Sequence, residues 1–174
     1  HYVTVDPRNA YVRYQIGEIY LDRGDLPHAD TAFAEALTID PKLASARVAT
    51  GVLAFQRGQL DEAERHLRAA LALKEDVRLA HFNLALIAEA RGDDRAAAAS
   101  YRTELDLHPT AFKAAFNLGR LQARQGEAVA AMASYKQAVE ANANFAEGFF
   151  YLAKAYLDSG RALNDAESNA RKGL

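Results

Sequence analysis

The sequence predicts an all-α fold in which helical hairpins stack into an α-solenoid, and three observations lead to this prediction. Apolar residues recur at helical spacing, and no stretch alternates apolar and polar residues as a half-buried strand does. A fixed period also divides the chain, which is the sequence signature of a repeat architecture. The period is clearest in five glycines that stand 34 residues apart: Gly24, Gly58, Gly92, Gly126 and Gly160.

Each repeat is predicted to contain two amphipathic helices joined by a tight turn. In the first repeat one helical run of apolar residues ends before Gly24, and the second ends before Pro41. Glycine suits the residue after a helix because it adopts a positive φ without strain, and proline prevents the second helix from continuing. Proline recurs in this phase at Pro109, whereas Glu75 and Ala143 occupy it in the intervening repeats.

Small residues of the first helix and large residues of the second follow the same period. Two helices approach closely only where Gly or Ala removes bulk, so we expect the two helices of a hairpin to meet at these positions. One hairpin buries too little surface to be stable alone, and its stability must come from stacking on its neighbours. The small positions are Gly17, Gly51, Ala85, Gly119 and Ala153, and the large ones are Phe33, Leu67, Tyr101 and Tyr135.

The order Ile16-Gly17-x-x-Tyr20, followed by Gly24, Ala29, Phe33, Ala36 and Pro41, resembles the tetratricopeptide repeat (TPR). This resemblance implies a right-handed α-solenoid of stacked antiparallel helix-turn-helix repeats. Two departures are visible: Glu104 replaces the small residue of Ala36, and in the fifth repeat a small residue falls one place late, at Ala166. We expect a single array with a tail of a preceding repeat at 1–9, four repeats at 10–43, 44–77, 78–111 and 112–145, and a truncated fifth repeat at 146–174.

Both ends of the chain fall inside a repeat. Residues 2–7 share the phase of 36–41, the end of a second helix, and 166–174 stop inside another second helix. A solenoid normally covers its terminal helices with a polar face. We therefore expect either a segment of a longer array or a homo-oligomer that pairs through uncapped end helices.

Composition excludes several classes of partner and site. The 174 residues carry 21 Lys and Arg against 23 Asp and Glu, so no overall basic field favours nucleic acid. No apolar run is long enough for membrane insertion, which requires about 20 residues. The absence of Cys excludes disulfides and thiolate ligands but is compatible with any redox compartment. We expect a soluble chain and slightly favour the cytoplasm.

No motif in the sequence predicts catalysis, cofactor binding or metal binding. The five histidines lack the short spacing of metal ligands, and no phosphate-binding loop or nucleophile motif occurs. Acidic pairs such as Asp93-Asp94 begin second helices, where negative charge favours the helix dipole, so we interpret them as capping residues. We therefore expect a chain that is not an enzyme and has no cofactor.

The resemblance implies a concave groove lined by the first helix of every repeat, and therefore a protein or peptide partner. Asn83 and Asn117 share one phase, and an amide both donates to and accepts from a peptide backbone. Nearby cations would bind an acidic side chain or a terminal carboxylate. A row of aromatic residues either forms the floor of the groove or packs between neighbouring helices: Phe82, Phe116 and Phe150. The predicted groove residues are Asn83, Asn117, Lys113, Arg120, Arg124, Phe82, Phe116, Val52, Phe55, Leu86, Tyr151 and Lys154.

Three functions are consistent with such an array. The leading hypothesis is a non-enzymatic scaffold for protein interaction that binds an extended peptide or a helix of a partner. The second is a structural spacer or oligomerisation segment of a larger assembly. The third is a set of repeats that recruits the substrate of an enzyme whose catalytic domain lies outside this sequence.

Overall fold

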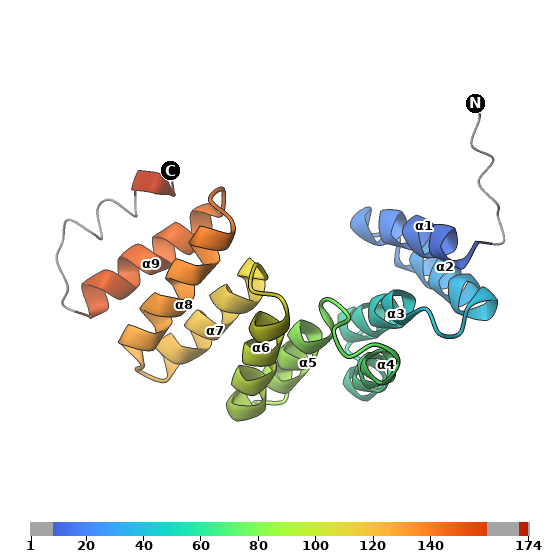
Figure 1. Ribbon diagram of the computed structural model, residues 1–174, viewed down its shortest axis with the longest axis horizontal. Helices are drawn as coiled ribbons and strands as arrows, with labels where there is room; N and C mark the ends of the chain where they lie inside the picture. The colour runs from blue at the N-terminus through green and yellow to red at the C-terminus, as the bar shows by residue number, and fades with distance from the viewer. Residues whose placement is uncertain (1–8, 160–170, 174) are drawn as a thin grey trace. The chain divides into compact units, whose positions relative to one another are not determined.

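The computed structural model describes residues 9–159 and 171–173, and every extended regular element in this part of the chain is an α-helix (Figure 1). Helices come in pairs joined by short turns, as the period predicts. In chain order they are α1 (Ala10–Asp22), α2 (Leu26–Ile39), α3 (Ala44–Gln56), α4 (Leu60–Leu73), α5 (Ala80–Ala90), α6 (Asp94–Leu107), α7 (Phe112–Arg124), α8 (Ala128–Ala141) and α9 (Ala146–Asp158).

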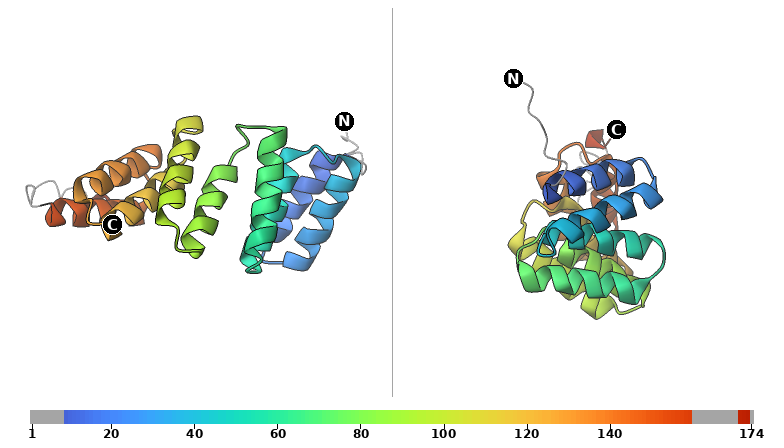
Figure 2. Two further views of the ribbon diagram at one scale, coloured as in Figure 1. Left: turned by 90° about the horizontal axis from the view of Figure 1, so that it is seen from below. Right: turned by 90° about the vertical axis from the view of Figure 1, so that its right-hand side faces the viewer.

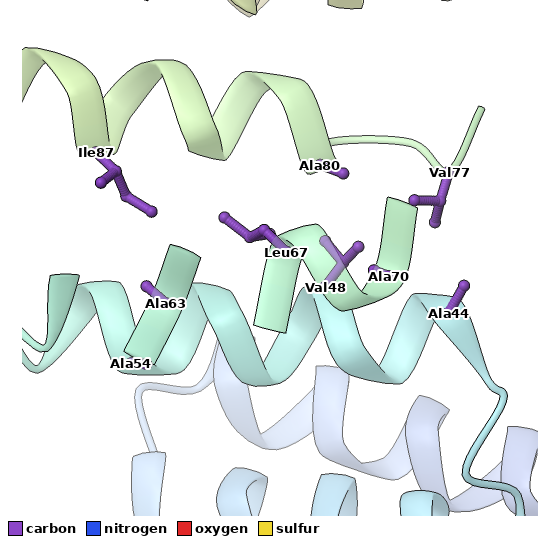
Figure 3. Close-up of a cluster of buried hydrophobic side chains, with 9 residues drawn as sticks. All are labelled: Ala44, Val48, Ala54, Ala63, Leu67, Ala70, Val77, Ala80 and Ile87. Carbon is purple, nitrogen blue, oxygen red and sulfur yellow. The ribbon is translucent and has the colours of Figure 1, made fainter. Parts of the chain in front are cut away.

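The chain divides into two compact units, His1–Ile87 and Ala88–Leu174, with the boundary inside α5. In the first unit α1 packs on α2, α3 packs on α4, and α2 contacts α3, so that the blue to teal helices lie side by side (Figures 1 and 2). Leu67 is fully buried in the second pair and is surrounded by small and aliphatic side chains, including Val48 and Ala70 (Figure 3).

In the second unit α7 packs against both α6 and α8, and α8 also packs against α9 (Figure 1). The large residues predicted for the second helices are the centre of this packing, because Tyr101 and Tyr135 are 0% and 2% exposed. Tyr101 belongs to α6 and Tyr135 to α8. Each of these rings carries a hydroxyl group, which needs a hydrogen-bond partner or access to solvent.

The glycine turns have the predicted backbone conformation. Gly24, Gly58, Gly92 and Gly126 all have φ between 75° and 80°. At the first turn the Gly24 amide donates to Leu21 O at 3.0 Å, and the next amide, that of Asp25, donates to Tyr20 O at 2.9 Å. This pair of bonds satisfies the last carbonyls of α1 in the manner of a Schellman motif. The fifth glycine, Gly160, and the late residue Ala166 lie outside the described residues.

The predicted close contact between small and large residues is confirmed in three hairpins. A Cβ atom added at Gly119 would lie 2.7 Å from Cδ1 of Tyr135, and one added at Gly51 would lie 3.0 Å from Cγ of Leu67. A Cβ at Gly17 would collide with the ring of Phe33. The glycine is therefore what allows the two helices of each of these pairs to approach.

The third repeat differs from the prediction at its first turn. Its first helix, α5, begins at Ala80 rather than at Arg78. The reason is that Leu79 has φ of 68°, a left-handed conformation that cannot belong to a right-handed helix. The Asn83 side chain donates to Leu79 O at 2.7 Å and satisfies the carbonyl of this strained residue.

Candidate functional site

The C-terminal unit contains a pocket on the surface formed by α7, α8 and α9. Its volume is about 320 Å³. Three helices supply its walls: α7 contributes one face, α8 contributes a single aromatic residue, and α9 contributes the opposite face. The lining residues are Arg120, Ala123, Arg124, Tyr135, Tyr151, Lys154, Ala155 and Asp158.

A cluster of aromatic rings supports one side of the pocket. Phe116 of α7 is 6% exposed and meets Tyr151 edge to face, with ring centroids 5.2 Å apart. It meets Phe145 in the same way at 4.9 Å, and Tyr135 lies 5.6 Å from Tyr151. Edge-to-face pairs of this kind fix ring orientation beyond what burial alone achieves. The two tyrosines that line the pocket are therefore held in place from behind.

The cations of the pocket differ in whether they have an anionic partner. Arg124 Nη2 lies 3.2 Å from Oε1 of Glu89 and 3.2 Å from Oδ1 of Asp94, so two carboxylates compensate its charge. Within the described residues, neither Arg120 nor Lys154 forms an ion pair. A carboxylate from a partner would find these two cations available for charge-assisted hydrogen bonds.

Burial raises the pKa values of the tyrosines on the second helices of this unit, Tyr101 and Tyr135. The pKa of Tyr135 is raised to about 12, mainly by loss of solvation and also by the nearby Tyr151, while the charge of Arg120 lowers it. Burial also raises the pKa of Tyr101, with the Glu89 charge adding to the effect. Both phenols are therefore neutral hydrogen-bond donors at any physiological pH.

Several predicted groove residues come together at this pocket, namely Arg120, Arg124, Tyr151 and Lys154. Lys113, also on α7, is exposed. Of the aromatic row, Phe116 packs inside the unit, whereas Phe150 is 62% exposed and rests edge-on against Tyr151 at 5.5 Å. Phe116 thus follows the packing alternative, and Phe150 presents an apolar surface to solvent.

The two asparagines expected to hold a peptide backbone have partners within the chain. Asn83 is 5% exposed and donates to Leu79 O. Asn117 is half-buried, and its side chain hydrogen-bonds the Tyr101 hydroxyl. Asn83 therefore supports the turn before α5 from a buried position.

The remaining predicted residues belong to the N-terminal unit. Val52 and Phe55 of α3 are half-buried and pack against the core cluster around Leu67. Phe82 and Leu86 of α5 are also half-buried. These residues contribute to the packing of their unit and leave only part of each side chain accessible.

Four lining residues of the pocket are absent from the predicted groove residues: Ala123, Tyr135, Ala155 and Asp158. Tyr135 was assigned to packing alone because it shares the phase of Phe33 and Leu67. The sequence did contain a signal at this position. Phe33 and Leu67 have no polar group there, whereas a tyrosine in the same buried position brings a hydroxyl that needs a hydrogen-bond partner. Comparison of the residues 34 positions apart around each tyrosine would have identified the pocket.

The described residues contain no cluster suited to metal binding, meaning three or more His, Asp or Glu side chains that converge. Burial and the charge of Arg65 lower the pKa of His66. His66 Nδ1 and His108 Nε2 are buried and have no hydrogen-bond partner among the described residues. Neither histidine lines the pocket. In the same part of the chain, no helix combines the length and the apolar character needed to cross a bilayer.

Fold and pocket together define a helical-repeat α-solenoid with a ligand-sized cavity. Family models described as tetratricopeptide repeat match residues 10–43, 48–111 and 91–146. The chain therefore belongs to the tetratricopeptide repeat family, whose members act in general as scaffolds for protein interaction. No curated protein matches it in sequence.

Solved structures resemble the chain at low sequence identity. MamA is 20% identical over 95% of this chain and 90% of its own, with a TM-score of 0.70. PilF of Pseudomonas aeruginosa is 20% identical over 95% and 76%, with a TM-score of 0.83. YrrB, described as "a TPR protein with an unusual peptide-binding site", is 17% identical over 97% and 86%, with a TM-score of 0.63. These similarities establish the fold.

Proposed function

We propose that this array is a non-enzymatic scaffold that holds an extended segment or a helix of a partner protein, with the pocket of α7, α8 and α9 as the anchoring point. The observation that carries the proposal is the pocket itself, a cavity of about 320 Å³ with two tyrosines and two cations that form no ion pair with any described residue. A pocket with aromatic walls and a few polar groups is typical of the anchor sites that dominate protein interfaces.

The charge and the aromatic surface of the pocket define what its partner offers. Arg120 and Lys154 favour an acidic group, and the exposed ring of Phe150 beside Tyr151 favours an apolar neighbour. An acidic segment with an apolar residue next to the anion matches both features. The peptide-binding site described for YrrB supports this use of the fold, although likeness of fold does not identify the same site.

Selection from a library of random peptides displayed on phage tests the proposal. Peptides selected on the wild-type protein are resynthesised and their Kd is measured by fluorescence polarisation. We expect the double variant Arg120→Ala/Lys154→Ala to weaken binding at least about tenfold, as expected for loss of two charge-assisted contacts. The matched control is Arg102→Ala/Lys136→Ala, which removes the same charge from exposed positions outside the pocket. Equal binding to wild type and to the pocket variant would refute the proposal.

One observation favours the oligomerisation alternative. A second cavity, of about 370 Å³, lies along α8 and α9 and is lined in part by the apolar residues Val139, Phe149, Leu152 and Tyr156. Apolar surface of this kind is also used for contacts between subunits. Light scattering across a range of protein concentrations tests this function, since a monomeric mass at every concentration would exclude it.

A further inference from the structure

Tyr101 and Tyr135 occupy equivalent positions in successive repeats, but their hydroxyl groups have different surroundings. The Tyr101 hydroxyl donates to Oε2 of Glu89 at 3.4 Å and is also hydrogen-bonded to the Asn117 side chain. The other oxygen of Glu89, Oε1, accepts from Arg124 at 3.2 Å. In this repeat a carboxylate of the chain itself therefore bridges the buried phenol and an arginine.

One repeat later, the carboxylate is missing. The residues 34 positions after Glu89 and Asn117 are Ala123 and Tyr151, and both line the pocket. No described residue hydrogen-bonds the hydroxyl of Tyr135, and the residue lines the pocket although it is only 2% exposed. A tyrosine hydroxyl at the wall of a pocket is available as a hydrogen-bond donor to a bound group. The pocket thus lies where the preceding repeat has Glu89.

The charges around the pocket match a single negative charge. Arg120 and Lys154 contribute two positive charges that no described residue pairs with, and Asp158 contributes one negative charge. Arg124 is compensated by its own two carboxylates. Without Arg124, the lining residues carry one net positive charge. One carboxylate neutralises this charge, whereas a dianionic phosphate would leave a negative charge uncompensated beside Asp158.

We propose that the pocket binds the side-chain carboxylate of a glutamate from the partner protein, in the place equivalent to that of Glu89. The carboxylate accepts a hydrogen bond from the Tyr135 hydroxyl and pairs with Arg120 and Lys154. This inference rests on the proposed function, because it specifies the chemical group that the scaffold recognises. The preceding repeat supplies the template for the contact within the same chain.

A first experiment needs no ligand. Ala123→Glu places the missing carboxylate on the chain itself, and Ala123→Gln is its neutral control of equal size. We expect the thermal midpoint of the Glu variant to exceed that of the Gln variant by about 2–4 °C, the change typical of one new contact in a chain of this length. The difference should become smaller in the Tyr135→Phe background, where only the contacts with Arg120 and Lys154 remain. Equal midpoints for Ala123→Glu and Ala123→Gln would overturn the inference.

The second experiment uses the peptides selected from the phage library, in which the random segment is fused at its carboxyl end. Any carboxylate that binds must then come from a side chain. In the resynthesised peptides, with amidated ends, replacement of the essential glutamate by glutamine should weaken binding at least about tenfold. Glutamine binding equally well, or phosphoserine at the same place binding more tightly, would overturn the inference.

A pair of tyrosine variants separates recognition from stability. Tyr135→Phe should weaken peptide binding about five- to tenfold and leave the thermal midpoint unchanged, because its hydroxyl has no partner within the described chain. Tyr101→Phe should lower the midpoint and leave binding unchanged. Peptides that depend on Arg120 and Lys154 but not on an acidic residue would overturn this inference alone, whereas peptides that depend on neither cation would refute the proposed function.

Discussion

Replacement of Gly119 by alanine should destabilise the C-terminal unit, even though alanine is the better helix former. The added Cβ atom would lie 2.7 Å from Cδ1 and Cε1 of Tyr135 and 3.2 Å from the carbonyl oxygen of Ala131. The Tyr135 ring has little freedom to move away, because its centroid lies 5.7 Å from that of Phe116 and 5.6 Å from that of Tyr151. The close approach of α7 and α8 therefore has to be relaxed.

Two effects of opposite sign set the size of this change. Overpacking of a well-packed core costs about 1–3 kcal/mol. Alanine in place of glycine inside a helix returns about 1 kcal/mol. Since the contact involves both a rigid ring and a backbone carbonyl, we expect a net loss of about 1–2 kcal/mol, which corresponds to a thermal midpoint lower by about 2–8 °C.

Urea denaturation followed by circular dichroism measures this loss. Gly126→Ala is a comparison variant without a steric clash, because no atom lies within 4 Å of an added Cβ; its loss of stability measures only the strain of a non-glycine residue at φ of 80°. In a Tyr135→Leu background the ring is absent, as it is at the natural Gly51–Leu67 contact, so Gly119→Ala should cost less there. A Gly119→Ala protein as stable as wild type, or an equal cost in both backgrounds, would contradict this account of the contact.

Three further predictions concern capping, titration and a buried hydrogen bond. Asp93→Ala should lower the free energy of unfolding by about 1 kcal/mol, because the Asp93 side chain caps α6. Gln59→Ala should change the free energy of unfolding little, since the Gln59 side chain makes no capping hydrogen bond at α4. Urea midpoints measure both changes. The pKa of Tyr135 is about 12 in the folded protein and 10 in its ordinary state, so the neutral phenol stabilises the fold fully below pH 10, and this stabilisation is lost between pH 10 and 12. Alkaline unfolding of wild type and of Tyr135→Phe measures the loss, which should be smaller in the variant. Ser134→Ala should cost about 1–3 kcal/mol because it leaves the buried Gln122 amide oxygen without its 2.7 Å donor, and the additional change Gln122→Leu should restore much of the loss in calorimetry.

The repeat architecture was predictable because many independent positions carry the same period. The glycine turns, the helical pairs and the contacts of Gly17, Gly51 and Gly119 all follow from residue size and backbone freedom, which depend on local sequence. The start of α5 was not predictable in this way. Nothing in the residue type of Leu79 indicates a positive φ, and the hydrogen bond from the Asn83 side chain to the Leu79 carbonyl is visible only in the structure.

The candidate site was predictable in part. Arg120 and Lys154 were identified because they lie on the first helices and carry charge, both of which are visible in the sequence. Asn117 was expected to bind a partner, but its amide is bonded to Tyr101, a contact between helices that depends on three-dimensional packing. Tyr135 was assigned only to the core, since position in a repeat indicates burial and does not indicate whether a hydroxyl is satisfied.

The shared torsions of the glycine turns make the helices interchangeable in principle. Gly24 and Gly58 adopt the same φ of 75°. Joining Gly24 directly to Gln59 would therefore keep the turn between the two helices and remove one complete repeat period. The first helix would then face a new neighbour, with Gly17 opposite Leu67 instead of Phe33. Recombination at these glycine turns would shorten or lengthen the array by whole repeats, and no new loop sequence would be needed.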